Sequence, residues 1–333
     1  MSWKNLKQRS LADALLTEHK ALTELDDVHE LIDWTRIETM LKDIHNNPRG
    51  EQAWPPLLML KAMLLQSWYN LSDPQLEKQL ARDLLFRRFV GISLSESVPD
   101  HSTLWRFRNK PEVMSLQEAL LLEVNHQLIE KGLLIKQGEI SIVDASVIKA
   151  QRNRPNKGVN GVNTQDPEAG YNVKTGSDGK VKTTYGYKAH VSVDEDDFIK
   201  ATDFTAGNVH DSQCFTELLS EEESEVFADS AYASQKTNEW LEQRDIGNGV
   251  LERAYRNKPL TDQQKASNKV KSRIRSGVER VFGILKLHYG MAKARYLGKA
   301  RNQMRFGMMC LAYNLKRGVS LQKEIQSLQD SFA

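Results

Sequence analysis

Hydrophobic residues in the first part of the chain recur at helical spacing. Between Leu57 and Trp68 the leucines return every three or four positions, after two prolines that suit a first helical turn. Ser72-Asp73-Pro74 supplies the capping residue and the proline of another helix start. Gly91 ends a further apolar run. The pattern predicts an all-helical amino-terminal domain over residues 1–135.

A short basic helix is predicted within this domain at residues 103–110. It carries Arg106 and Arg108 between Leu104 and Phe107. Short helices, a turn and then a basic helix are typical of a helix-turn-helix, whose last helix contacts DNA. The alternative is an ordinary amphipathic helix whose two apolar residues lie in a core.

The pattern changes near Gly138, where alternation replaces helical spacing. Residues 139–143 are a short apolar run that predicts a strand. Residues 151–184 are rich in Gly, Asn, Lys and Asp and predict a long loop or an irregular hairpin. Residues 185–193 and 198–204 alternate on either side of a turn at 194–197, which predicts a β-hairpin.

Strands and helices alternate over the rest of the chain. Helices are expected at 211–219, 234–243, 268–288 and 300–317, and strands at 226–228 and 249–251. This order predicts an α/β domain with a mixed sheet over residues 136–318, followed by a tail over 319–333.

Charge is distributed unevenly along the chain. Residues 251–317 contain 17 lysines and arginines but three acids, whereas the whole chain has a net charge of only +2. Segregation of this kind indicates a surface for nucleic acid. The alternative is a solvated helical surface without a partner.

Two cysteines without metal-ligand spacing do not form a disulfide framework, which fits a reducing compartment. The first residues contain no apolar core of a signal peptide, and we find no run of about 18 uncharged apolar residues. These observations predict a cytoplasmic protein that does not contact a membrane.

Three carboxylates are candidates for one site. Asp144 and Asp229 each follow an apolar, strand-like run, and a buried strand end disfavours a carboxylate without a partner. Glu279 lies on a predicted helix, with Arg275 one turn before it and Lys286 two turns after. The alternatives are a turn or capping role for each aspartate and a surface pair between Arg275 and Glu279.

Three distant carboxylates that converge can hold two Mg²⁺ ions, which prefer oxygen ligands. Such a pair of ions stabilises the attacking and leaving oxygens of phosphoryl transfer. The surrounding positive charge suits a polyanionic substrate. The residues therefore predict metal-dependent chemistry on nucleic acid.

Several segments share a pattern with a known family. They are Val143-Asp144-Ala145-Ser146, Tyr185-Gly186-Tyr187-Lys188-Ala189-His190, Ala228-Asp229-Ser230-Ala231-Tyr232 and Arg275-x3-Glu279-x6-Lys286. Over residues 54–317 the chain resembles DDE transposases of bacterial insertion sequences, close to the IS-four and IS-five groups. The resemblance implies an RNase H-like catalytic domain that cleaves DNA at element ends and transfers strands into target DNA.

The resemblance also assigns roles to residues. Asp144, Asp229 and Glu279 would be the catalytic triad that binds Mg²⁺ or Mn²⁺, and Arg275 and Lys286 would hold DNA. The partners would be the terminal inverted repeats of the element and the target DNA, bound by a homodimer in the bacterial cytoplasm at the nucleoid.

Further contacts are expected from Lys188 and His190, which share one strand face and could touch phosphate. For His190 a hydrogen-bonded structural role is the alternative. Arg106 and Arg108 would contact DNA from the helical domain.

Two positions depart from the family pattern. Ser272 stands where the IS-four pattern has a tyrosine, and a serine cannot stack a flipped base. Ser230 replaces a glycine that often follows the second aspartate. Neither change removes a metal ligand.

Two other functions fit much of the same pattern. One is a DNA-binding protein without catalysis, against which the three intact carboxylates argue. The other is an RNase H-like nuclease that hydrolyses DNA without joining it.

Overall fold

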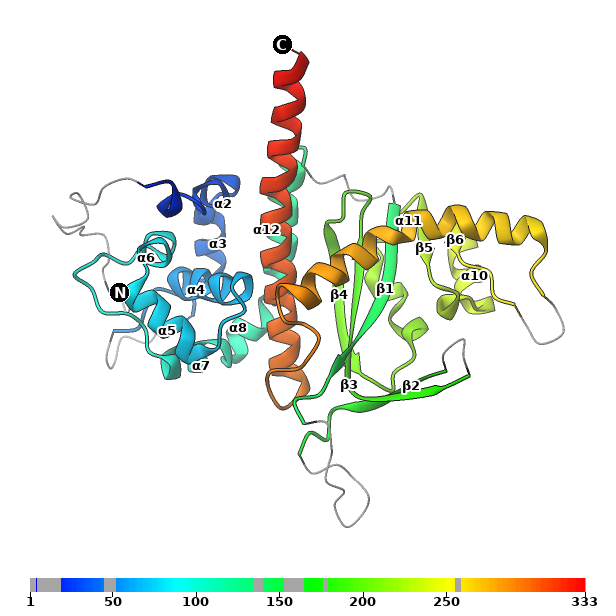
Figure 1. Cartoon of the computed structure of the whole chain (residues 1–333), viewed down its shortest axis with the longest axis horizontal. Helices are drawn as coiled ribbons and strands as arrows, with labels where there is room; N and C mark the ends of the chain where they lie inside the picture. The colour runs from blue at the N-terminus through cyan, green and yellow to red at the C-terminus, as the bar shows by residue number, and fades with distance from the viewer. Residues whose placement is uncertain are drawn as a thin grey trace. The chain divides into compact units, whose positions relative to one another are not determined.

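The structure is a computed structural model that describes residues 4, 19–44, 52–133, 140–152, 165–175, 179–254 and 259–332. The chain forms two compact units (Figure 1). One consists of Met1–Leu133 with Gly307–Ala333, and the other of Leu134–Phe306. Residues 307–333 therefore belong with the helical unit, whereas the sequence pattern placed them in the catalytic domain and a tail.

The first unit is helical, as the apolar spacing predicted. Its described elements are η1 (Lys20–Leu22), α2 (Asp26–Leu31), α3 (Trp34–Met40), α4 (Pro56–Trp68), α5 (Asp73–Arg82), α6 (Leu84–Val90), α7 (His101–Arg108), α8 (Pro111–Ser115), α9 (Gln117–Glu130) and the part of α12 (Lys299–Phe332) that follows residue 306.

Helix α4 lies in the core of this unit. The sequence indicated one apolar stripe, but the helix is buried on nearly every side. Even Lys61 is only 6% exposed, and its ammonium lies 4.5 Å from the centre of the Trp34 ring. The ammonium also lies 3.0 Å from His29 Nε2. This contact, the long apolar stem of the side chain and the aromatic face of Trp34 reduce the cost of burying the charge.

Helix α12 is joined to the core of this unit by polar contacts. The indole of Trp68 donates a hydrogen bond to the carbonyl of Ala312 at 2.8 Å. Asn314, which is fully buried, donates to Asn125 at 2.7 Å. Buried polar groups are costly without partners, so these bonds fix how the helix packs.

The second unit has one sheet, in which the described strands are β1 (Ile140–Lys149), β2 (Gly170–Thr175), β3 (Val181–Val193), β4 (Ile199–Ala206), β5 (Glu225–Ala228) and β6 (Gly247–Val250). The order is β2-β3-β1-β5-β6, and β4 pairs with β3. Strands β1, β3 and β4 pair antiparallel, while β5 and β6 run parallel to β1. The predicted mixed α/β sheet is confirmed.

The expected hairpin corresponds to β3 and β4, whereas the first strand differs from its prediction. Strand β1 does not end before Asp144 but continues to Lys149. It continues because β3 pairs with it along Ile142–Lys149, beyond the point where the pairing with β5 stops. Asp144 is therefore at a mid-strand position.

The remaining elements of this unit are η2 (Asp211–Cys214), η3 (Thr216–Leu218), η4 (Ser230–Tyr232), α10 (Gln235–Glu242), α11 (Asp262–Leu287) and the start of α12. The helix expected at 211–219 is thus two short 3₁₀ helices, with His210 rather than Asp211 as the first cap. Helix α11 begins six residues earlier than expected, at a Thr261 capping box.

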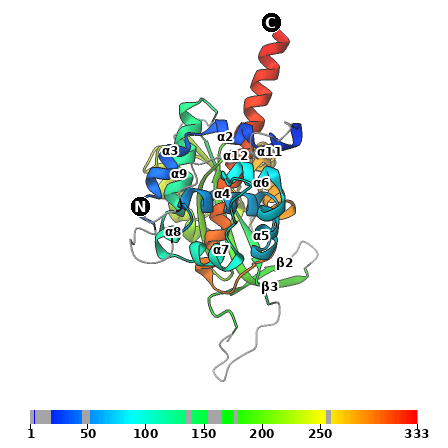
Figure 2. The same cartoon turned by 90° about the vertical axis from the view of Figure 1, so that its left-hand side faces the viewer.

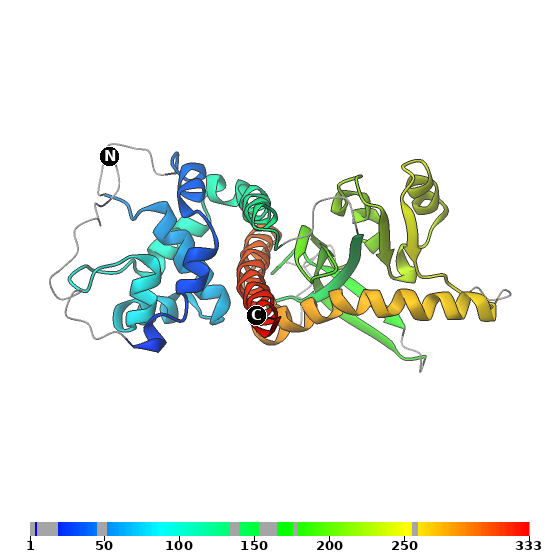
Figure 3. The same cartoon turned by 90° about the horizontal axis from the view of Figure 1, so that it is seen from above.

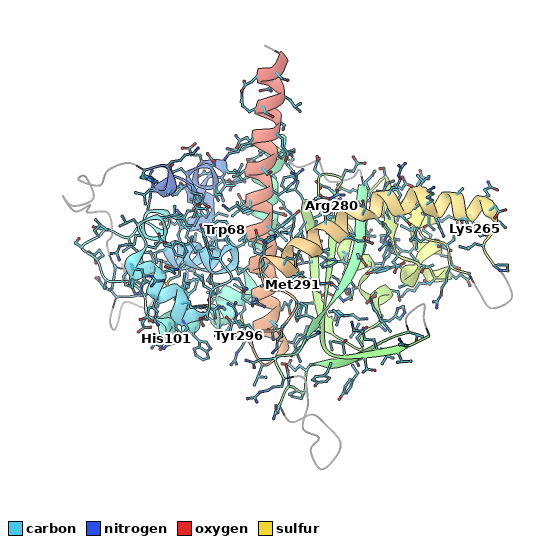
Figure 4. The ribbon with its side chains drawn as sticks, viewed as in Figure 1. Trp68, His101, Lys265, Arg280, Met291 and Tyr296 are labelled. Carbon is cyan, nitrogen blue, oxygen red and sulfur yellow. The ribbon has the colours of Figure 1, made fainter. Side chains whose placement is uncertain are left out.

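The two faces of the sheet are covered by different helices (Figure 3). On one face, Val143 and Val226 belong to a buried cluster that includes Leu241 of α10. On the other, Gly277 of α11 comes within 3.7 Å of Ile142, measured from an ideal Cβ. Figure 4 marks α11 by Lys265 near its start and Arg280 in its second half. Side chains alternate along a strand, so Ile142 and Asp144 share the α11 face.

Both cysteines, Cys214 and Cys310, are unpaired and buried. Over the described parts of the chain, no helix combines the length and the apolar character that crossing a bilayer requires.

Candidate active site under helix α11

Asp144 and Asp229 occupy matching positions on neighbouring parallel strands. The last residue pair of the β1–β5 ladder is Val143 with Ala228, and the two aspartates follow directly. Adjacent strands lie about 4.8 Å apart, so the register places the two residues side by side. Because Ile142 pairs with Phe227 on the α11 face, both carboxylates emerge on that face.

Each aspartate is oriented by a hydrogen bond from the next residue. Asp144 Oδ1 accepts from the backbone N–H of Ala145 at 2.8 Å. Asp229 Oδ1 accepts from the backbone N–H of Ser230 at 2.6 Å, as the cap of η4. Asp229 therefore caps η4, as one alternative predicted, and also lies in the candidate site.

Arg275 of α11 lies between the two carboxylates. Its guanidinium is 3.4 Å from Asp144 Oδ2 and 4.0 Å from Asp229 Oδ1. The residue is only 8% exposed. A cation over two acids offsets their mutual repulsion, and α11 is thereby tied to the strands that carry them.

Burial raises the pKa of the Asp144 carboxyl to about 6. The Arg275 cation and the bond from Ala145 act to lower it, while the Asp229 charge raises it further. The charged form of Asp144 is thus disfavoured by its surroundings. A further cation beside both aspartates would favour ionisation.

Glu279 lies one helical turn after Arg275, but its side chain is exposed. It forms no ion pair with another residue in the described parts of the chain. Nor does any set of three His, Cys, Asp or Glu side chains there come close enough to hold one metal ion. The structure therefore brings Asp144 and Asp229 together. Glu279 shares helix α11 with Arg275 but does not join the two aspartates in a three-residue cluster.

Two lysines complete the electrostatics of the site. Partial burial lowers the pKa of the Lys286 ammonium, while the Asp144 charge acts to raise it. Lys174 of β2 is near enough to affect both Asp144 and Lys286. The sequence pattern did not single out Lys174, which falls in the segment predicted to be a long loop or an irregular hairpin; the pairing of β2 with β3 matches the hairpin alternative. The alternation of β2 was the available signal.

Lys188 and His190 point into the protein instead of toward a phosphate. The Lys188 ammonium bonds Asp211 at 2.7 Å, and His190 Nε2 is hydrogen-bonded to Thr205 Oγ1 at 2.8 Å. Lys188 is 6% exposed and His190 is fully buried, which lowers the pKa of His190. His190 therefore has the hydrogen-bonded structural role that was its alternative. Lys188 forms an internal ion pair in place of the phosphate contact expected for it.

The two arginines of α7 have different surroundings. Arg106 is exposed, but Arg108 is 2% exposed and forms an ion pair with Asp73 and a 3.0 Å hydrogen bond to Gln66. Arg108 therefore joins α7 to α4 and α5 and is not available to DNA, contrary to the prediction. Leu104 and Phe107 are in the core, as the amphipathic alternative required.

Comparison with protein families identifies the chain. A family model described as a transposase DDE domain matches residues 135–315, which is more than half of the chain. The protein belongs to the DDE transposase family. A second family model, described as a transposase domain, matches residues 10–110 of this chain. The observed mixed sheet preceded by helices agrees with the predicted α/β catalytic domain and helical amino-terminal domain.

Solved transposase complexes are more distantly similar. A piggyBac transposase synaptic complex with hairpin DNA is 12% identical with a TM-score of 0.42, and the match covers 94% of this chain and 77% of that one. A Mos1 transposase paired-end complex with the left transposon end is 11% identical with a TM-score of 0.19, over 79% of this chain and 86% of that one. The family assignment rests on the family models alone.

Proposed function

We propose that this transposase cleaves DNA at the ends of a mobile element and then joins the freed 3′-hydroxyl to target DNA. The observation that carries the proposal is the Val143–Ala228 pairing, which puts Asp144 and Asp229 side by side beneath a basic helix. Arg275 and Lys286 from that helix supply positive charge at the two carboxylates. Such a site fits a phosphodiester, whose reaction develops negative charge on oxygen.

The cofactor that suits these residues is Mg²⁺ or Mn²⁺. Two carboxylates on neighbouring strands are hard oxygen donors, and the raised pKa of Asp144 indicates that one nearby cation, Arg275, does not fully offset its burial. A bound pair of divalent ions would supply stabilisation of the attacking and leaving oxygens. We infer that Asp144 and Asp229 hold this metal.

Glu279 is the third residue of the proposed triad. It is exposed on α11, and its side chain is not held by an ion pair with any other described residue. Because Arg275 anchors the same helix to the two aspartates, a change of side-chain rotamer or a small shift of α11 would move Glu279 toward them. We infer that Glu279 joins the site when DNA and metal bind.

The helical unit is proposed to bind the terminal inverted repeats of the element, through the exposed outer face of α7 with Arg106. Two chains would then hold two element ends, as a homodimer on DNA. The strongly basic composition of residues 251–317 supports contacts with the flanking and target strands.

The test of the proposed function is Asp229→Asn, assayed for Mg²⁺-dependent cleavage and strand transfer on a duplex taken from the DNA that flanks the coding region. We expect loss of both products by at least a hundredfold with DNA binding retained, because the amide removes the charge of a metal ligand and little volume. Asp262→Asn, at a side chain 98% exposed, is the matched control and should cleave normally.

Cleavage by Asp229→Asn at the wild-type rate would reject the assigned site. Cleavage without joined products in the wild-type protein would instead identify a nuclease that does not transfer strands.

A further inference from the structure

Strand β2 and the first half of β3 form a two-stranded ribbon that extends past the other strands. Residues 181–186 of β3 pair with β2, whereas β1 and β4 pair with β3 only from Gly186 and Tyr187 onward. Figures 1 and 2 show the ribbon projecting from the sheet. The ribbon is not part of the packed core, because no third strand pairs with it within the described residues.

Close backbone contacts fix the point where the ribbon leaves the sheet. Gly170 pairs with Gly186 at this point. A Cβ on Gly186 would lie 2.0 Å from the carbonyl oxygen of Ile148, and one on Gly170 would lie 2.8 Å from the backbone nitrogen of Asn208. Only glycine allows such an approach, so the direction of the ribbon is set by packed backbone.

Like charges lie opposite each other on the ribbon. Lys174 pairs directly with Lys182, and both are exposed. Like charges at opposed positions destabilise a strand pair. Neither lysine forms an ion pair with another residue in the described parts of the chain. A polyanion bound to the ribbon would remove this repulsion.

The other face of the ribbon is apolar and exposed. Tyr171 is 48% exposed, Val173 61% and Val181 64%. The Tyr171 and Tyr185 rings lie 4.8 Å apart and support the strand pair. A ribbon of two strands is marginally stable in water by itself, so a bound partner would stabilise it.

The ribbon continues the strand that pairs beside Asp144. Asp144 of β1 pairs with Val191 of β3, and the ribbon begins at Gly186, five residues away along β3. At about 3.4 Å per residue this separation is roughly 17 Å. DNA held at Asp144 and Asp229 would therefore pass the ribbon.

We propose that the β2–β3 ribbon, residues 170–175 and 181–186, lies in the major groove of the duplex beside the cleaved phosphate, with Lys174 and Lys182 on the backbone phosphates. This inference rests on the proposed function. The groove is about 12 Å wide and admits a two-stranded ribbon. Six residues of strand extend about 20 Å, which spans roughly half a turn of DNA.

The first experiment measures DNA affinity against salt for the full chain with Lys174→Gln and Lys182→Gln combined. Each lost phosphate contact lowers the slope of log K against log salt by about 0.9, so we expect a decrease of roughly 1.8. The charge-preserving variant with Lys174→Arg and Lys182→Arg should keep the wild-type slope. Lys236→Gln, on the exposed side of α10, is the control for an unrelated lysine.

The second experiment is a disulfide crosslink to a duplex with a thiol tether on the backbone next to the cleavage position. Cys214 and Cys310 are buried, so an introduced cysteine is the reactive thiol. We expect Lys182→Cys to crosslink at least tenfold more than Lys236→Cys. Equal crosslinking, or an unchanged salt slope, would overturn the inference.

The outcomes separate this inference from the proposed function. If the wild-type protein cleaves and transfers DNA while the double glutamine variant keeps the wild-type slope, the ribbon assignment fails and the transposase mechanism stands. If Asp229→Asn cleaves normally, the active site fails whatever the ribbon contacts.

Discussion

Asp144 holds its carboxyl group where the charged form is unfavourable. Only 20% of its side chain is exposed, and burial raises its pKa to about 6 despite the Arg275 cation. Above its ordinary pKa of about 4 the unfolded chain releases this proton, while the folded protein retains it until about pH 6. In this window the folded state binds more protons, so rising pH reduces stability.

Asp144→Asn should therefore stabilise the protein without metal at pH 7.5. Since one pKa unit is worth about 1.4 kcal/mol, we expect a gain on the order of 1–3 kcal/mol in the free energy of unfolding. Near pH 4 most of the gain should be lost, because Asp144 is then protonated in the folded protein and about half protonated in the unfolded chain. Urea unfolding at both pH values measures this.

Mg²⁺ provides the control for that prediction. It should stabilise the wild-type protein and not the Asp144→Asn variant, since a ligand that binds only the folded state shifts unfolding. A variant less stable than wild type at pH 7.5 would contradict the account of Asp144.

At the scale of elements, α7 shows how one helix divides its residues between structure and surface. Arg106 and Arg108 are two positions apart and so lie on different faces, about 200° apart around the helix axis. Packing against α5 decides that Arg108 is inside, where it meets Asp73. The sequence predicts the helix and its basic character, but not which arginine faces solvent.

Arg108→Ala should destabilise the helical unit, because it leaves Asp73, whose side chain is only 14% exposed, without its cation. Removing one partner of a buried pair typically costs about 3–5 kcal/mol. Arg106→Ala, the matched exposed control, should change the free energy of unfolding by less than about 0.5 kcal/mol. Urea unfolding of the two variants measures the difference.

DNA affinity should be lowered by the substitution that leaves stability unchanged. We expect Arg106→Ala to weaken binding to the flanking-DNA duplex severalfold at constant stability. Equal loss of stability in both variants would contradict the assignment of faces on α7.

At the scale of the whole molecule, binding and catalysis should depend on different groups. Lysines and arginines provide DNA affinity, while the carboxylates provide the metal-dependent step. Chelation with EDTA should therefore abolish cleavage of the flanking-DNA duplex and leave its Kd within about threefold. A mobility shift and a cleavage assay on the same samples measure this. Loss of binding on chelation would show that metal, not basic charge, holds the DNA.

The local pattern predicted much of this protein. Periodicity is a property of neighbouring residues, so the helices of the first unit, the β3–β4 hairpin and the mixed sheet followed from it. The apolar runs before Asp144 and Asp229 also identified both aspartates. The extension of β1 was missed, and β2 was left undecided between a loop and an irregular hairpin, because each is held by pairing with β3 and not by strong local preference.

The sequence by itself determined the kinds of elements and the candidate acids, since these depend on short-range spacing. Only the tertiary structure decided which groups meet. The Val143–Ala228 register joins aspartates 85 positions apart, Arg275 lies between them, and Lys188 is taken up by Asp211. The physical reason is that burial and pairing energies depend on distant segments, which no local pattern contains.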